Sequence, residues 1–185
     1  MSTLFRHVPN LLTGLRLVSA PAVAILLFDG NDRAALGIFA LAGLSDAADG
    51  FLAKRFGFAT RFGRYLDPAA DKLLMLASFV TLSIMHEAPL WLTGLVVGRD
   101  LAIVLGVIAV VTFELPIAIK PLYVGKVSTA CQIVYILLAL ILRSAELAWP
   151  SVLNAIALLT AFATMLSWSG YGLLLVRALA TRIRS

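Results

Sequence analysis

The stretch Asp46-Ala-Ala-Asp49-Gly50-Phe-Leu-Ala53-Lys54 organises this sequence, together with a second segment after eight intervening residues, Gly63-Arg-Tyr-Leu-Asp67-Pro-Ala-Ala-Asp71. The chain has ten acidic residues, and four of them lie in these two segments. On a helix, residues three or four positions apart share a face, so each segment presents a pair of carboxylates. Like charges repel strongly in a low dielectric. The two pairs therefore require cations between them, or protonation.

The rest of the chain is apolar to a degree that is typical of membrane proteins. Its 185 residues are 61% hydrophobic, with a mean hydropathy of +0.98, whereas soluble domains are about half apolar. The apolar residues fall in long runs, which are typical of membrane-spanning helices. We predict an all-α polytopic membrane protein with a short N-terminal interfacial segment at residues 1–10. The six predicted transmembrane helices cover residues 11–28, 33–53, 63–85, 90–113, 125–142 and 151–176.

The basic residues favour one orientation of these six helices. With the N-terminus in the cytoplasm, two bases fall on the outer side, Arg33 and Arg143, and ten on the inner side, Arg6, Lys54, Arg55, Arg61, Arg64, Lys120, Lys126, Arg177, Arg182 and Arg184. This bias predicts that both termini are cytoplasmic. We expect a single transmembrane domain over residues 1–185, without a cleavable signal peptide. We interpret the net charge of +5 as topology and contact with anionic lipid, and not as nucleic-acid binding.

The acidic pairs predict a site for hard cations. The single cysteine, Cys131, allows neither an internal disulfide nor a CxxC zinc site, and we interpret it as a small buried hydrophobe. Carboxylates without His or Cys select Mg²⁺, Mn²⁺ or Ca²⁺. Two metals about 4 Å apart are the arrangement used in phosphoryl displacement. A phosphate-rich substrate at the inner membrane surface fits best, because bases are within reach: Lys54, Arg55, Arg61, Arg99 and Lys126.

Two alternatives to a metal-dependent enzyme remain open at this point. In a purely structural interpretation the acids pair with bases, Asp46 or Asp49 with Arg16 and Asp71 with Lys72. Four acids outnumber the bases within the spans, however, and intramembrane acids usually mark function. A cation or proton transporter would predict repeat symmetry or a charged path to the outer face, and the sequence shows neither.

The two segments resemble the signature of the CDP-alcohol phosphotransferases, D-x2-D-G-x2-A-R-x8-G-x3-D-x3-D. Every spacing is kept, with matches at Asp46, Asp49, Gly50, Ala53, Gly63, Asp67 and Asp71. The one departure is Lys54, which stands where the family has arginine and removes a planar bidentate donor. Residues 9–16 also resemble the opening segment of the family, and residues 125–130 resemble the start of its fifth helix.

The resemblance implies a six-helix homodimer, with a polar chamber open to the cytoplasmic side of a bacterial inner membrane. It implies a metal site for two Mg²⁺ or Mn²⁺ ions, made by Asp46, Asp49, Asp67 and Asp71, of which Asp71 would also be the catalytic general base. It implies substrate contacts by Gly50, Ala53, Lys54, Thr60, Gly63, Arg99 and Lys126, the last two at phosphate. The implied reaction transfers a phosphatidyl group from CDP-diacylglycerol to a glycerol-derived acceptor and releases CMP.

Two subgroups of the family differ in the acceptor. Cardiolipin synthases of the mitochondrial type use phosphatidylglycerol, whereas phosphatidylglycerophosphate synthases use glycerol 3-phosphate. Gly98-Arg99-Asp100 and residues 116–122 resemble the first subgroup, whereas Gly125-Lys126-Val127 resembles the second. We favour phosphatidylglycerol and keep glycerol 3-phosphate as the alternative. Another alcohol, such as serine or inositol phosphate, is a more remote one.

Overall fold

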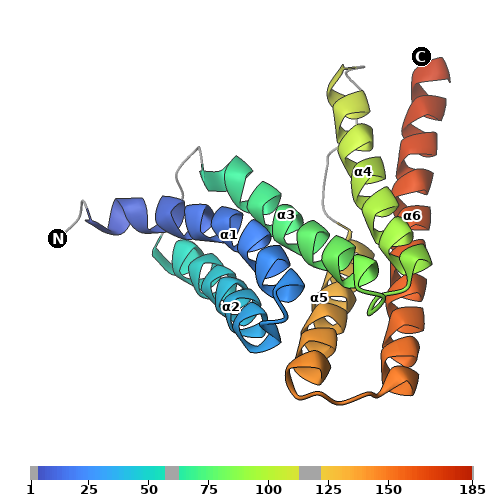
Figure 1. Ribbon diagram of the computed structural model, residues 1–185. Coiled ribbons are helices and arrows are strands. Elements are labelled where there is room, and N and C mark those ends of the chain that lie inside the picture. The colour runs from blue at the N-terminus through green and yellow to red at the C-terminus, as the bar shows by residue number, and fades with distance from the viewer. Residues whose placement is uncertain (1–3, 57–62, 113–121, 185) are drawn as a thin grey trace. The chain divides into compact units, whose positions relative to one another are not determined.

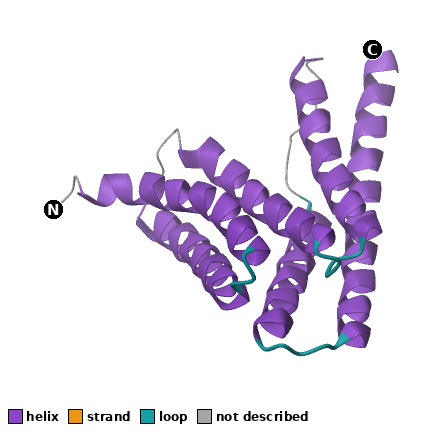
Figure 2. Cartoon of the chain, in the orientation of Figure 1, coloured by secondary structure: helices purple, strands orange, loops and turns teal. Residues whose placement is uncertain are grey.

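The computed structural model describes the backbone of residues 4–56, 63–112 and 122–184. Of their side chains it describes those of residues 14–45, 70–110, 112, 122–174 and 176. The described backbone forms six helices, α1 (Leu4–Phe28), α2 (Asp32–Phe56), α3 (Gly63–Ile84), α4 (Leu90–Thr112), α5 (Tyr123–Ser144) and α6 (Pro150–Arg184). Within these ranges there is no strand (Figure 2). The prediction of an all-α fold is confirmed.

The helices extend beyond several of the predicted spans. The first helix begins at Leu4 instead of residue 11, and the last continues to Arg184 instead of ending at residue 176. The reason is that hydropathy marks only the apolar part of a helix, whereas the backbone hydrogen bonds continue through adjacent basic residues. Arginine is a good helix former, so the basic C-terminal segment does not end α6.

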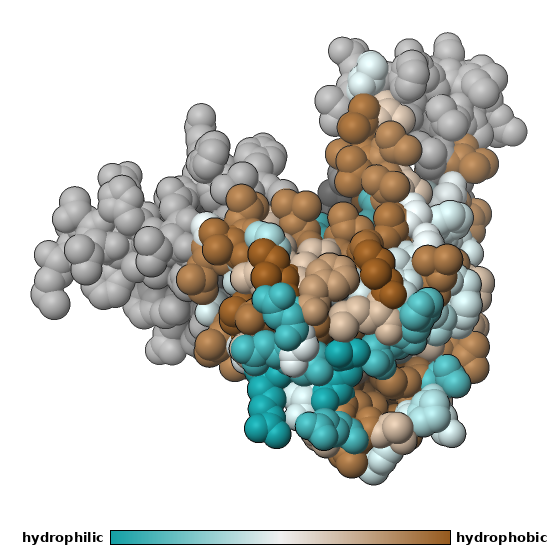
Figure 3. Space-filling model, viewed as in Figure 1, coloured by the Kyte–Doolittle hydropathy of each residue, from teal (hydrophilic) through white to brown (hydrophobic). Residues whose placement is uncertain are grey.

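Three helices are long and apolar enough to cross a membrane, counting only the residues that the structure describes. These stretches are Leu90–Val110, Tyr123–Ser144 and Pro150–Leu174, and α1 contains a shorter apolar stretch, Gly14–Phe28. Large apolar side chains point outward on the same helices, as Leu105 at 64% exposure and Leu158 at 64% exposure illustrate. Figure 3 shows such side chains over much of the face in view. This surface suits lipid better than water, whereas six membrane crossings remain a prediction.

The chain divides into two compact units, each of which is described here by itself. The first contains residues 1–87 and 136–148, and the second contains residues 88–135 and 149–185. In the first unit, α1 packs along both α2 and α3 (Figure 1). Its core contains Val23, Leu27, Phe39, Phe79 and Leu82, all less than 5% exposed. Because α1 contacts both helices that carry the acidic segments, residues of α1 can help to form the site.

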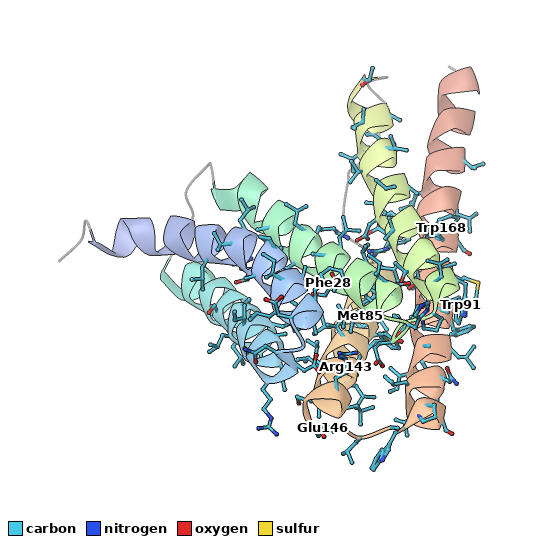
Figure 4. All side chains as sticks on the ribbon, viewed as in Figure 1. Phe28, Met85, Trp91, Arg143, Glu146 and Trp168 are labelled. Atoms are coloured by element: carbon cyan, nitrogen blue, oxygen red, sulfur yellow. The ribbon has the colours of Figure 1, made fainter. Side chains whose placement is uncertain are left out.

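Arg143, in the last turn of α5, joins three segments at one end of the first unit. Its Nε donates to Asp32 Oδ1 at 2.9 Å, and its Nη1 donates to Glu87 Oε1 at 2.8 Å. Asp32 begins α2, and Glu87 follows α3. Hydrophilic side chains gather toward the lower end of the view in Figure 3, where Figure 4 shows Arg143 and Glu146. The start of α2 and the end of α3 therefore meet at one end, as antiparallel helices require.

Three helices of this unit end in the same left-handed turn. The residue after the last turn has a positive φ in each case, 73° at Gly30, 62° at His86 and 56° at Glu146. The next amide donates at 2.8 Å to a carbonyl of the last helical turn, which satisfies a group that the helix leaves without a partner. Only glycine adopts this conformation without steric cost. The closure of the turn therefore outweighs that cost at His86 and Glu146.

In the second unit, α4 packs against α6. A Cβ added at Gly98 of α4 would lie 3.4 Å from the Trp168 ring, and Figure 4 shows Trp168 on α6. Several buried side chains between α5 and α6 are polar and bonded to one another. The Ser128 and Thr164 hydroxyls lie 3.1 Å apart, and Gln132 donates to Ser128 at 3.3 Å. Such satisfied contacts hold helices together at little cost in an apolar surrounding.

Candidate active site

The two acidic pairs lie on helices, as their spacing predicts. Asp46 and Asp49 belong to α2, and Asp67 and Asp71 belong to α3. At a rise of about 1.5 Å per residue, Asp46 lies about 21 Å along α2 from Asp32. By the same rule, Asp71 lies about 20 Å along α3 from Ile84. Both pairs therefore lie toward the end of the first unit that is opposite Arg143.

The side chain of Asp71 is the one member of the predicted metal set that lies among the described side chains. Its Oδ1 lies 3.5 Å from Nη1 of Arg16, and its side chain is 44% exposed. Arg16 comes from α1 and is 1% exposed. The attraction between the two charges favours a position of the Asp71 carboxylate beside the buried guanidinium. The structural alternative considered from the sequence paired Arg16 with Asp46 or Asp49 and Lys72 with Asp71, and the contact between Arg16 and Asp71 was not among its pairs.

The other predicted residues of the two segments lie outside the described side chains. This holds for Asp46, Asp49, Gly50, Ala53, Lys54, Gly63 and Asp67, whose backbone is helical. Thr60 lies between α2 and α3, outside the described residues altogether. Their predicted contacts with metal and cytidine therefore stay predictions.

Arg99 and Lys126, the two predicted phosphate contacts, differ in their surroundings. Arg99 is 3% exposed and is bonded to protein groups on all three of its guanidinium nitrogens. Lys126 is exposed in the first turn of α5. Both belong to the second unit. Of the two, Lys126 has the accessibility that binding of a phosphate requires.

An open apolar groove of about 460 Å³ runs along α1 and α3 in the first unit. Its lining consists of Leu17, Ala20, Pro21, Leu73, Leu76, Ala77 and Val80. Leu17 follows Arg16 directly, and Leu73 comes two residues after Asp71. The helices that hold the ion pair therefore also present an apolar surface of the kind that a lipid tail contacts.

The chemistry of the predicted donor set fits a divalent cation. The set consists of carboxylates alone, which hard cations prefer. Asp71 supports this assignment, because its side chain is 44% exposed although Arg16 lies 3.5 Å away. Part of the Asp71 side chain is thus accessible beside the guanidinium. The described part of the predicted site, Asp71 beside the buried Arg16, is polar and charged.

Two residues with a part in these arrangements were absent from the site predicted from the sequence. Arg16 is one, and a charge within the first predicted span was the signal that could have identified it. Ser167 of α6 is the other, because its hydroxyl accepts hydrogen bonds from Nε and Nη2 of Arg99 at 3.2 and 3.1 Å. No sequence signal singles out Ser167, since serines are common in membrane helices as packing residues.

The sequence model of the CDP-alcohol phosphatidyltransferase family matches residues 6–178. The cardiolipin synthase (CMP-forming) of Homo sapiens is 30% identical over 184 residues, which cover 89% of this chain and 61% of that protein. A probable phosphatidylglycerophosphate synthase of Mycobacterium tuberculosis is 36% identical over 136 residues, which cover 70% of this chain and 64% of that protein.

A third relative comes from Oryza sativa subsp. japonica. It is the chloroplastic CDP-diacylglycerol--glycerol-3-phosphate 3-phosphatidyltransferase 1, which is 32% identical over 192 residues covering 91% of this chain and 57% of that protein. The chain thus spans less than two thirds of the length of each of these three relatives. The names of the first two relatives give different products, cardiolipin and phosphatidylglycerophosphate, and the name of the third contains glycerol 3-phosphate, so similarity alone does not select an acceptor.

Proposed function

The chain belongs to the CDP-alcohol phosphatidyltransferase family, and from this premise we propose that it transfers a phosphatidyl group from CDP-diacylglycerol to a glycerol-derived acceptor, releasing CMP. The observation that carries the proposal is the complete spacing of the acidic signature on α2 and α3, with Asp71 held beside Arg16 at 3.5 Å. The apolar groove along the same α1 and α3 supports a lipid as substrate.

The four aspartates of the signature have a division of roles in this proposal. Asp46, Asp49, Asp67 and Asp71 would hold two Mg²⁺ or Mn²⁺ ions, which offset the charge on the phosphoryl oxygens when bound. Asp71 also accepts the proton of the acceptor hydroxyl. The acceptor oxygen forms a bond to the lipid-side phosphorus, the phosphoanhydride bond breaks, and CMP leaves with the bonding electrons. Arg16 orients the Asp71 carboxylate toward the hydroxyl.

The remaining predicted residues bind the donor or the acceptor. Gly50, Ala53 and Gly63 leave room for cytidine, which Thr60 borders, while Lys54 binds the diphosphate and Lys126 binds a phosphate. We place the site and both termini on the cytoplasmic side of a bacterial inner membrane, and we propose a homodimer. The positive-inside bias of the sequence supports this orientation.

We propose phosphatidylglycerol as the preferred acceptor, which would make the protein a cardiolipin synthase. The bonds of Arg99 support this choice, because a phosphorylated soluble acceptor requires several accessible bases and Arg99 is engaged with protein groups. The segment Gly98-Arg99-Asp100 supports it too, through its resemblance to cardiolipin synthases. Glycerol 3-phosphate is the second candidate, favoured by Gly125-Lys126-Val127.

The decisive experiment uses the purified full chain in detergent or nanodiscs. The enzyme is given CDP-diacylglycerol with Mg²⁺ or Mn²⁺, and phosphatidylglycerol and glycerol 3-phosphate are offered in separate reactions. Mass spectrometry of the lipid product and measurement of released CMP identify the reaction. We expect cardiolipin and CMP from the first mixture. Phosphatidylglycerophosphate from the second mixture alone would reverse the acceptor, and no CMP with any alcohol would contradict the proposed activity.

Replacement of Arg16 by glutamine is expected to lower kcat by about ten- to a hundredfold, because a residue that orients a ligand or base has effects of this size. The KM for CDP-diacylglycerol should change less than kcat, because Asp46, Asp49 and Asp67 still hold the metal site that binds the donor. Arg16→Lys should recover part of the loss, because it retains the charge without the planar fork. Initial rates over a range of donor concentrations measure both parameters.

Arg33→Gln is the matched control for the arginine at position 16. Arg33 is exposed and donates from Nε to the Ser144 carbonyl at 3.4 Å, at the opposite end of the first unit from Asp71. This variant should retain wild-type kcat. An Arg16→Gln protein that is folded, as judged by its melting temperature, and has wild-type kcat would contradict the orienting role of Arg16.

A further inference from the structure

The buried side chain of Arg99 joins all three helices of the second unit. From α4, its Nε and Nη2 donate to Ser167 Oγ of α6 at 3.2 and 3.1 Å. Its Nη2 also donates to the Gly125 carbonyl of α5 at 3.3 Å, and its Nη1 donates to Asp100 Oδ1 at 2.7 Å. The guanidinium is thus fixed by protein acceptors from three directions.

The start of α5 is fitted closely around this guanidinium. A Cβ added at Gly125 would lie 3.0 Å from Arg99 Nη2 and 3.1 Å from the Tyr171 hydroxyl, so only a hydrogen atom fits there without displacement. The Tyr171 hydroxyl in turn accepts a hydrogen bond from the backbone amide of Leu122 at 3.2 Å. Side chains of α4 and α6 therefore hold the first turn of α5 on two sides, and this turn carries the exposed Lys126.

We propose that Arg99 is a positioning residue and not a phosphate ligand. It fixes the first turn of α5 through the Gly125 carbonyl and Ser167, and so sets the position of Lys126, the base that contacts the substrate phosphate. This inference rests on the proposed function for the role of Lys126. It replaces the direct phosphate contact of Arg99 that the sequence resemblance implied.

Charge and burial both argue against direct binding of phosphate by Arg99. Its charge lies 2.7 Å from the Asp100 carboxylate, so the pair is neutral overall and attracts an anion weakly. Its side chain is 4% exposed, and a phosphate ligand would have to replace acceptors that are buried with the guanidinium, such as the Ser167 hydroxyl. Lys126 is exposed and lies one residue after Gly125. Any movement of the Gly125 carbonyl therefore moves Lys126 directly.

The test is a double-mutant cycle between Ser167→Ala and Lys126→Ala in the full chain. Ser167→Ala removes an acceptor of the guanidinium without adding volume, and we expect it to lower kcat/KM by about tenfold, the effect of a hydrogen bond to a charged group. Most of this loss should appear in KM, since Asp71 is unchanged. In the Lys126→Ala background, Ser167→Ala should lower kcat/KM by less than about twofold, because coupled residues are not additive.

Arg99→Lys separates the two possible roles of the charge. A lysine retains a point charge that binds phosphate but loses the fork that bonds Ser167 and Gly125 together. Under our proposal its kcat/KM should fall as in Ser167→Ala. Arg99→Lys with wild-type kcat/KM, or additive effects in the cycle, would overturn the proposal. If Arg99→Lys does not fold, the double-mutant cycle between Ser167→Ala and Lys126→Ala still tests whether Arg99 positions Lys126.

Ser169→Ala is the matched control, because its exposed hydroxyl, on the same helix, donates to the Met165 carbonyl at 3.0 Å. It should retain wild-type KM and kcat. Hydrogen exchange of residues 122–126 adds a readout that needs no activity, and it should be faster in Ser167→Ala than in Ser169→Ala. If the wild type transfers no phosphatidyl group, the proposed function fails. The exchange experiment still tests whether Ser167 and Arg99 hold this turn. Equal exchange rates of residues 122–126 in Ser167→Ala and Ser169→Ala would overturn that role.

Discussion

Asp71→Asn is expected to lower kcat for phosphatidyl transfer by about 10²- to 10⁴-fold, the contribution of a positioned general base. Asparagine retains the shape of the side chain but cannot accept the proton of the acceptor hydroxyl. Binding of CDP-diacylglycerol should remain measurable, because three other aspartates of the signature remain. Released CMP gives the rate, and titration with CDP-diacylglycerol in nanodiscs gives the affinity.

Asp29→Asn is the control for this substitution. Asp29 is exposed directly after α1, at the end of the first unit where α2 begins, and it should retain wild-type activity. Because Asp71 lies 3.5 Å from the buried Arg16, the melting temperature of Asp71→Asn must be measured as well. A folded Asp71→Asn protein whose kcat lies within tenfold of the wild type would remove Asp71 as the general base.

Asp49→Ala is expected to weaken metal binding and donor binding together, each by more than about a hundredfold. Loss of even an outer partner of a metal ligand costs ten- to a hundredfold in affinity, and loss of a ligand itself should exceed this. The donor is affected because its diphosphate is held through the same metal site. Activity measured over a range of Mn²⁺ concentrations gives the apparent metal affinity, and CMP binding with and without Mn²⁺ gives the linkage.

The expected linkage has a specific pattern that can fail. Wild-type protein should bind CMP only with the divalent cation present, whereas Asp49→Ala should bind CMP weakly under both conditions. Asp29→Ala should behave as the wild type. If the apparent metal affinity of Asp49→Ala is unchanged, Asp49 is not a ligand and the division of roles among the four aspartates is wrong.

The helices and the location of the acidic pairs could be predicted from the sequence. Long apolar runs and residue spacing are local properties, so α2 and α3 appeared close to the expected residues, and Asp46, Asp49, Asp67 and Asp71 fall on them as expected. The backbone conformation at the helix ends was less predictable. His86 and Glu146, which follow α3 and α5, adopt a left-handed conformation that favours glycine. Neither residue is glycine, so the sequence did not predict this conformation.

The partners of the long charged side chains could not be predicted. Arg143 bonds to Asp32 at a separation of 111 residues, and Arg99 bonds to Ser167 at a separation of 68 residues. Lys72 was a candidate partner of Asp71 in the structural alternative, whereas the contact of Asp71 with the buried Arg16 of α1, at 3.5 Å, was not predicted. Residues of packed helices can face each other although they are far apart in the sequence, and residue spacing along one helix does not reveal such contacts.

By itself, the sequence determined that this is an all-helical chain of membrane-protein composition. It also determined the complete acidic signature of the family, because composition and residue spacing do not depend on the fold. Only the tertiary structure decided that Arg16 faces Asp71 and that Arg99 is engaged by Gly125 and Ser167. The physical reason is that helix packing decides which acceptors lie within reach of a long, flexible, charged side chain. In an apolar surrounding it must find one, since a buried charge without a partner is strongly unfavourable.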